Sequence, residues 1–173
     1  MKNNRSLGFS IVELVVVVAV IAVMAGVLVP RVSNQMAYSR DERRLADMNR
    51  VRSAIDQFYA DKGYYPPADQ NTSYGGWDVS HDATFIQALT NEGYLEGDVR
   101  DPVNDETYHY RYFVYEKGSY GCKGTTRFYV LGVRNFENLS FAEKNTGFFE
   151  CANRNWGSEF AYVTGGGGGP RSE

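Results

Sequence analysis

One acidic residue in this 173-residue chain occupies a position where acids are rare. Glu13 lies near the start of the apolar run from Ile11 to Val29, and it is the only charged residue in that run. A carboxylate costs about 2.5 to 3.5 kcal/mol at the centre of a membrane and less near its edge, so an ionisable group in such a segment indicates a function. The sequence therefore predicts that Glu13 has a partner of opposite charge.

Two cysteines, Cys122 and Cys151, could form a disulfide. The disulfide would close a loop of about 30 residues and stabilise the fold by about 3.5 kcal/mol on the chain-entropy model. Disulfides form in oxidising extracytoplasmic compartments, and the charges near the N-terminus predict that this part of the chain lies in one. Two buried free thiols are the alternative, because sequence spacing does not establish that the sulfur atoms are close together.

The other polar residues form no catalytic or zinc-binding motif. His81 and His109, the only histidines, occur neither in an HExxH pattern nor beside a cysteine at metal-ligand spacing. The chain has no GxSxG motif, and its glycine-rich stretches lack the strand-to-helix context of a phosphate-binding loop. We therefore expect a protein that is not an enzyme and has no cofactor.

One acidic stretch could supply oxygen ligands to calcium. Its members are Asp98, Asp101, Asn104 and Asp105. Their spacing differs from that of an EF-hand loop, so we interpret them as turn residues around Pro102. Calcium binding in this region is the alternative.

The segment that contains Glu13 is predicted to be a membrane-spanning helix. At 1.5 Å per residue it is about 28 Å long, close to the thickness of the hydrocarbon core. Lys2 and Arg5 precede it without an acid, which predicts a cytoplasmic N-terminus and an extracytoplasmic head. The alternative is a secretory signal cleaved before Gly26, after the small-residue pattern that ends at Ala25.

Helical periodicity continues beyond the apolar run, from Arg31 to Tyr59. Apolar residues recur at spacings of three, four or seven within two groups, first Val32 and Met36 and then Leu45, Met48, Ile55 and Phe58, so that one face is apolar. The charged residues 40–44 are interpreted as a solvated face, because exposed ion pairs contribute only tenths of a kcal/mol. Gly26 and Pro30 are the predicted weak points of the helix, and Gly63 followed by prolines is predicted to end it.

The residues after the helix predict a small antiparallel sheet laid on its C-terminal half, which is an α+β fold. Strands are expected at 108–115, 126–133 and 160–164, with a short helix before them that Asp82 caps and that ends near Gly93. The 13 tyrosines are interpreted as strand packing, with a ligand-stacking surface as the alternative. Residues 165–169 are all glycine and are predicted to begin a mobile tail.

The N-terminal residues resemble those of a known family. The string from Leu7 to Leu14 follows a short basic leader, precedes an apolar helix, and resembles the N-terminus of type IV pilins and type II secretion pseudopilins. The resemblance implies that a prepilin peptidase cuts after Gly8 and methylates Phe9. Glu13 and Pro30 would then be the fifth and twenty-second residues of the mature chain, where the family keeps a glutamate and often a proline.

Two further stretches resemble the major pseudopilins of this lineage. One is the turn from Phe58 to Pro66, and the other is the Asp101-Pro102 turn before an aromatic strand, although the usual tryptophan after that proline is missing from this chain. Some pilins also close a C-terminal loop with a disulfide, and some major pseudopilins bind calcium in the head. The resemblance therefore favours the disulfide and permits calcium.

The resemblance implies four regions: a leader at 1–8, an assembly helix at 9–30, a head at 31–164 and a tail at 165–173. The function it implies is that of a non-enzymatic subunit of a pilus-like filament or secretion pseudopilus. Its implied partners are further copies of the chain, a prepilin peptidase, a platform membrane protein and an assembly ATPase. Glu13 would neutralise the Phe9 amine of a neighbour or, alternatively, of its own chain.

The expected location is the inner membrane, with the head periplasmic or extracellular. A formal net charge of -3, with bases interleaved among acids, offers no basic surface for nucleic acid. The alternative function is that of a monomeric, membrane-anchored protein whose tyrosine-rich head binds a ligand.

Overall fold

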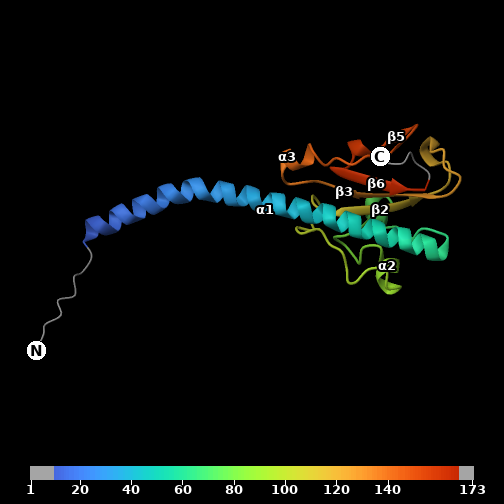
Figure 1. The fold of residues 1–173 in the computed structure, drawn as a ribbon, viewed down its shortest axis with the longest axis horizontal. Coiled ribbons are helices and arrows are strands. Elements are labelled where there is room, and N and C mark those ends of the chain that lie inside the picture. Colours follow the sequence, from blue (N-terminus) through green and yellow to red (C-terminus); the bar gives the residue numbers. More distant parts are fainter. Residues whose placement is uncertain (1–9, 168–173) are drawn as a thin grey trace, which may run out of the picture. The chain divides into compact units, whose positions relative to one another are not determined.

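The computed structural model describes residues 10–167, and for residues 27–30 it describes the backbone alone. The chain divides into two compact units, Met1–Ala37 and Tyr38–Glu173. Helix α1, Ile11–Lys62, contributes to both units (Figure 1).

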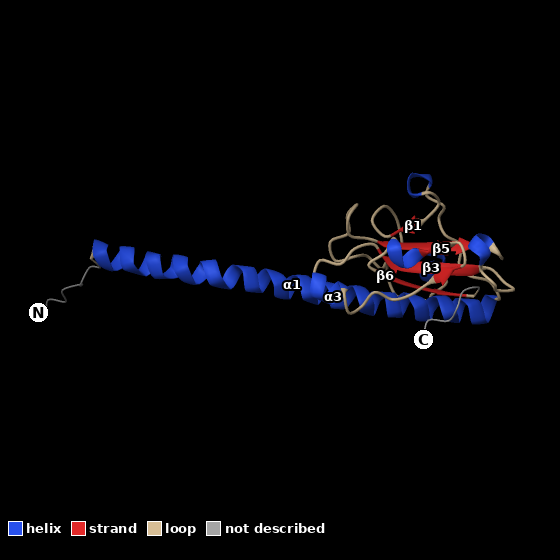
Figure 2. Cartoon of the chain, turned by 90° about the horizontal axis from the view of Figure 1, so that it is seen from above, coloured by secondary structure: helices blue, strands red, loops and turns tan. Residues whose placement is uncertain are grey.

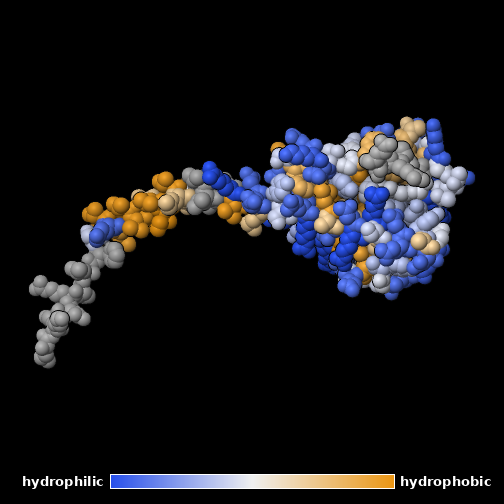
Figure 3. Space-filling view, viewed as in Figure 1, coloured by the Kyte–Doolittle hydropathy of each residue, from blue (hydrophilic) through white to orange (hydrophobic). Residues whose placement is uncertain are grey.

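The described part of the first unit is helical and apolar. Large apolar side chains from Ile11 to Met24 are 50% to 80% exposed, and Figure 3 shows them as a hydrophobic surface. This stretch of α1 is long and apolar enough to cross a membrane. The helical backbone continues through Gly26 and Pro30, the predicted weak points. Whether the helix unwinds there on assembly stays a prediction.

The second unit is an α+β structure, as the sequence predicts. Its main sheet has four antiparallel strands in the order β1-β2-β3-β6, and these are β1 (Asp78–Val79), β2 (Tyr110–Tyr115), β3 (Phe128–Val133) and β6 (Tyr162–Gly166). A separate hairpin pairs β4 (Glu150–Cys151) with β5 (Arg154–Asn155). The short helices are α2 (Gln87–Asn91) and α3 (Leu139–Ala142), and single turns of 3-10 helix are η1 (Thr72–Tyr74), η2 (Ser119–Gly121) and η3 (Trp156–Ser158) (Figure 2).

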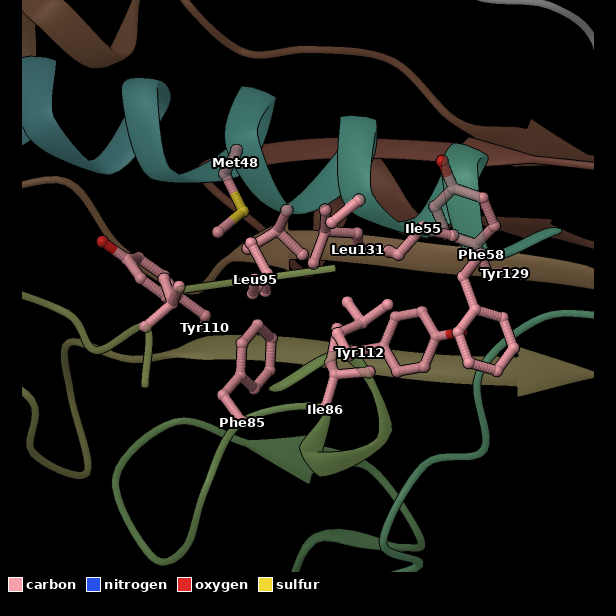
Figure 4. Packing of buried hydrophobic residues seen from close by; sticks show 14 of the residues in the cluster. Met48, Ile55, Phe58, Phe85, Ile86, Leu95, Tyr110, Tyr112, Tyr129 and Leu131 are labelled. Carbon is pink, nitrogen blue, oxygen red and sulfur yellow. The ribbon is translucent and has the colours of Figure 1, made fainter. Parts of the chain in front are cut away.

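Two hydrophobic clusters cover the two faces of the sheet. In β3, Leu131 belongs to the cluster that contains Met48, Ile55 and Phe58 of α1. Figure 4 shows these side chains packed with residues of β2 and with Phe85 and Ile86, which precede α2. The next residue toward the N-terminus of β3, Val130, belongs to the second cluster, with Trp156. Because successive side chains in a strand point to opposite faces, β3 is buried on both sides.

The four tyrosines that are buried in the head all lie in β2 and β3, as the strand-packing interpretation predicts, while the other nine are half-buried or exposed. Tyr110, Tyr112 and Tyr129 are each at most 1% exposed, and all three belong to the cluster on the α1 face. The hydroxyl of Tyr110 donates to the Asp47 carboxylate over 2.9 Å, and that of Tyr112 donates to the carbonyl of Pro66 over 2.8 Å. These side chains are therefore not available as a stacking surface.

The predicted cap of α2 is wrong. The residue before α2 is Ile86, which has a φ of 47° and no side-chain cap. Asp82 instead accepts a hydrogen bond from the side-chain amide of Asn71. The backbone N–H of Ile86 donates to the Asp78 carboxylate over 3.2 Å. A carboxylate of β1 therefore fixes the residue that precedes α2.

The prediction that a mobile glycine tail begins at Gly165 is wrong. Gly165 and Gly166 belong to β6, where Gly165 pairs with Val130. A Cβ atom at Gly165 would lie 2.5 Å from the Phe149 ring and from the carbonyl oxygen of Tyr129. Glycine is needed at this position because the strand passes close to other atoms. Residues 168–173 of the predicted tail lie outside the described residues.

Candidate functional site

The exposed apolar surface of the first unit is the first candidate site. Its residues from Ile11 to Met24 form a helix with no buried side chain. An apolar surface of this extent is stable only in contact with lipid or with other apolar groups. It therefore fits a membrane or a set of neighbouring helices.

Glu13 lies at the start of this surface, and among the described residues its side chain accepts one hydrogen bond. Its Oε2 atom accepts the backbone N–H of Ser10 over 3.0 Å, and the Ser10 hydroxyl oxygen accepts the N–H of Val12 over 3.3 Å. A serine followed three residues later by a glutamate is a helix-capping pattern. Glu13 thus has a local role, and its predicted pairing with a Phe9 amine stays a prediction, because Gly8 and Phe9 lie outside the described residues.

A buried ion network in the second unit forms the other notable site. Arg44 is completely buried, and its guanidinium binds Asp101 through two hydrogen bonds of 2.6 and 2.8 Å. The same guanidinium donates to Asp41 over 2.6 Å and to Glu137 over 2.8 Å. Burial would lower the pKa of Arg44, but these hydrogen bonds and charges raise it, so it stays charged.

This network connects three parts of the head. Asp41, which is also fully buried, accepts the backbone N–H groups of Glu137 over 3.1 Å and of Asn138 over 2.8 Å. Asn138 in turn caps α3 by accepting the N–H of Phe141. Hydrogen bonds from Arg40, together with Arg44, lower the pKa of Glu137. The network therefore fixes α1 to the Asp101 turn and to the start of α3.

The interpretation of residues 40–44 as a solvated face is wrong for Asp41 and Arg44 and holds for Arg43, whose side chain is 68% exposed. The spacing of Asp41 and Arg44 in the sequence indicates that both residues are buried. Asp41 and Arg44 precede Met48, Val51 and Ile55 at intervals of three and four residues, so they continue the buried stripe of the helix. A buried charged group needs partners of opposite charge, and Arg44 has Asp41 one turn away and Asp101, a residue far along the chain.

The acidic stretch 98–105 is predicted to form turns, with calcium binding as the alternative. In the structure its side-chain oxygens bind groups of the protein. Asp98 pairs with Arg100 over 2.6 Å, Asp101 binds Arg44, and Asp105 accepts the N–H groups of two following residues. The Asn104 side-chain oxygen accepts the Ser80 hydroxyl over 2.9 Å. These contacts agree with turn residues, and calcium binding stays an untested alternative.

The predicted disulfide between Cys122 and Cys151 is present, with 4.9 Å between the Cα atoms. It links the residue after η2 to β4. A groove of about 800 Å³ lies beside it, lined by residues of both loops that include Lys123, Glu150 and Asn153. The disulfide therefore holds together the two loops that form this groove.

Replacing both cysteines with serine should lower the free energy of unfolding by about 3.5 kcal/mol, because the unfolded chain would regain the freedom of the open loop. The measurement is urea denaturation of the wild-type and double-serine proteins, each with and without reductant. Reductant should destabilise only the wild type. Labelling of both native cysteines as free thiols would contradict the prediction.

Comparisons with known proteins match both the N-terminal segment and most of the chain. Residues 3–29 match the family model described as the prokaryotic N-terminal methylation motif. Type II secretion system core protein G of Vibrio cholerae is 24% identical over 140 residues, which cover 76% of this chain and 84% of the relative. The protein of the same name from Escherichia coli K12 is 23% identical over 124 residues, covering 69% and 79%. No solved structure matches this chain at the level of significance that these relatives reach.

Proposed function

We propose that this chain, a pilin and pseudopilin family protein by its N-terminal motif and its similarity to core protein G, is a structural subunit of a type II secretion pseudopilus. The observation that carries the proposal is the exposed apolar helix from Ile11 to Met24, which lies within the residues that match that motif. A pilus-like filament of another system is the nearest variant of this function.

The proposed mechanism begins with a membrane-anchored precursor. Cleavage after Gly8 frees the amine of Phe9 at the start of an apolar helix. When the subunit leaves the bilayer, its apolar side chains have to be transferred from lipid to the helices of other subunits without exposure to water. The partners proposed for this transfer are a platform membrane protein and an assembly ATPase, after processing by a prepilin peptidase.

Glu13 is proposed to select the position of each incoming subunit. Its carboxylate can pair with the Phe9 amine of a neighbouring subunit, and the pairing offsets the desolvation of both groups. The hydrogen bond to the Ser10 backbone uses one carboxylate oxygen, Oε2, so the other can accept a second donor.

Mass spectrometry of the mature protein tests the processing step. The protein recovered from the membrane should begin at a methylated Phe9, because the peptidase removes the leader and modifies the new N-terminus. A protein that begins at Gly26 would establish a secretory signal and contradict the proposal. A Gly8→Val variant is the control, since a branched side chain before the cut should leave the precursor uncleaved.

A further inference from the structure

Two histidines from distant parts of the chain meet beside β2. The rings of His81 and His109 have centroids 5.0 Å apart, and Tyr74 lies edge-on to His81 at 5.2 Å. The guanidinium of Arg111, in β2, lies 5.3 Å from the centre of the Tyr74 ring. Through these contacts the segment from Asp69 to Asp82, which contains η1 and β1, is fastened to β2; we refer to it as the 69–82 segment.

The hydrogen bonds of His109 determine which of its nitrogens carries the proton. Nε2 lies 2.8 Å from Nε of Arg111, and an arginine can only donate, so Nε2 has to be the acceptor. Nδ1 lies 3.0 Å from the carbonyl oxygen of Asp105, which can only accept, so Nδ1 carries the hydrogen. A second proton on Nε2 would point its N–H at the N–H of Arg111. The geometry therefore requires a neutral His109.

The charged and titratable groups around His109 agree with this requirement. His109 is completely buried. Its pKa is lowered to about 4 by burial first, then by the charges of Arg111, His81 and Arg134, against a hydrogen bond to the Asp105 backbone that raises it.

The 69–82 segment itself carries another buried titratable group, Asp78. This side chain in β1 is 1% exposed, and its Oδ2 accepts the N–H groups of Asp69 over 3.3 Å and Ile86 over 3.2 Å. Its Oδ1 is buried and has no hydrogen-bond partner within the described residues. An ionised carboxylate at this position would be a buried charge with one unsatisfied oxygen, which is costly.

The groups that face Asp78 do not offset that cost. Burial first, and then the charges of Asp69 and Asp82, raise its pKa to about 7 against the two backbone hydrogen bonds, which lower it. Tyr112, which pairs with Asp78 from β2, has a pKa raised first by burial and then by Tyr129 and Asp78. Asp78 is thus held in place most firmly when it carries a proton.

We propose that the 69–82 segment is held against the head by two titratable groups, Asp78 and His109, that both have to be uncharged and that respond to pH in opposite directions. Opening of the segment hydrates both groups. As pH falls from about 6.5 toward 4, the opened state gains a proton on His109, and this favours opening. As pH rises from about 4 toward 7, the opened state loses the proton of Asp78, and this also favours opening.

Over this range the two effects oppose each other in the wild-type chain. The opening equilibrium of the 69–82 segment therefore changes little between pH 5 and pH 7. Removal of either titratable group should reveal the pH dependence that the other group gives to this equilibrium. This pH compensation is a property of the head and does not depend on the proposed function.

Amide hydrogen exchange of the full-length chain in detergent micelles tests the proposal at pH 5 and pH 7. The opening equilibrium of the 69–82 segment is obtained after correction for the intrinsic pH dependence of exchange, and the peptide covering β3 reports global unfolding. In Asp78→Asn, which keeps an acceptor for both N–H groups, opening should increase about twentyfold from pH 7 to pH 5. In His109→Gln, which keeps an acceptor for Arg111, it should increase about fiftyfold from pH 5 to pH 7.

Wild type and the double variant should each change less than about threefold between these pH values. The proposal would be overturned if opening changed with pH in the same direction in both single variants, or if it did not change with pH in either. If a variant unfolds, as β3 exchange would reveal, nitrogen NMR shifts of the wild-type imidazoles decide. A neutral His109 protonated on Nδ1 down to about pH 5 is expected, and a proton on Nε2 at pH 7 would overturn it.

Discussion

Glu13→Leu should abolish or strongly reduce filament formation while leaving the subunit in the membrane. The substitution removes the cost of a carboxylate in an apolar segment, so insertion and cleavage after Gly8 should proceed normally. It also removes the proposed counter-charge for the Phe9 amine of a neighbour. The measurement is the ratio of sheared filament to membrane-bound mature subunit at equal expression.

Two further variants separate this charge from the helix cap that the structure shows. Glu13→Gln keeps a side chain that can accept the Ser10 N–H, since glutamine also serves in capping boxes, but it carries no charge. Ser10→Ala removes the hydroxyl acceptor for Val12 and keeps the charge. We expect an intermediate filament yield from Glu13→Gln and a nearly normal yield from Ser10→Ala.

The opposite ranking of these two filament yields would mean that Glu13 acts only as a helix-capping residue. A normal filament yield from Glu13→Gln, with a low yield from Ser10→Ala, would mean that the cap matters and the charge does not. A normal yield from Glu13→Leu would exclude both roles in assembly. The three variants together therefore assign the residue to one mechanism.

The parts of the fold that the sequence predicts well are those set by local periodicity. The stripe through Met48, Ile55 and Phe58 predicts the buried face of α1, and runs rich in aromatic residues predict β2 and β3. Each of these patterns needs only neighbouring residues and one buried surface. Burial of the stripe then brings the sheet onto the helix.

The features that the sequence does not predict depend on residues far apart in the chain. Arg44 and Asp101 form a buried pair across 57 positions, and although the helical stripe indicates that Arg44 is buried, no local pattern identifies Asp101 as its partner. His81 and His109 meet because β1 pairs with β2, and β1 has only two residues. Gly165 looks like the start of a linker, but the closeness of Phe149 requires a glycine within a strand.

Arg44→Met should strongly destabilise the head. The substitution keeps a long apolar side chain but leaves Asp41 and Asp101, which both bind this guanidinium, without their buried counter-charge. Removal of one partner from a buried ion pair typically costs about 3 to 5 kcal/mol. The measurement is the free energy of unfolding from urea denaturation of the full-length chain in micelles.

Arg43→Met is the matched control, because this neighbouring arginine is 68% exposed and lies 3.9 Å from Asp47. An exposed pair of this kind contributes about 0 to 1 kcal/mol, so the control should remain close to wild type. A combined Arg44→Met and Asp101→Asn variant should recover part of the lost stability, because it removes one of the buried charges left without a partner. If the two arginine variants are equally stable, the ion pairs of Arg44 do not stabilise the head.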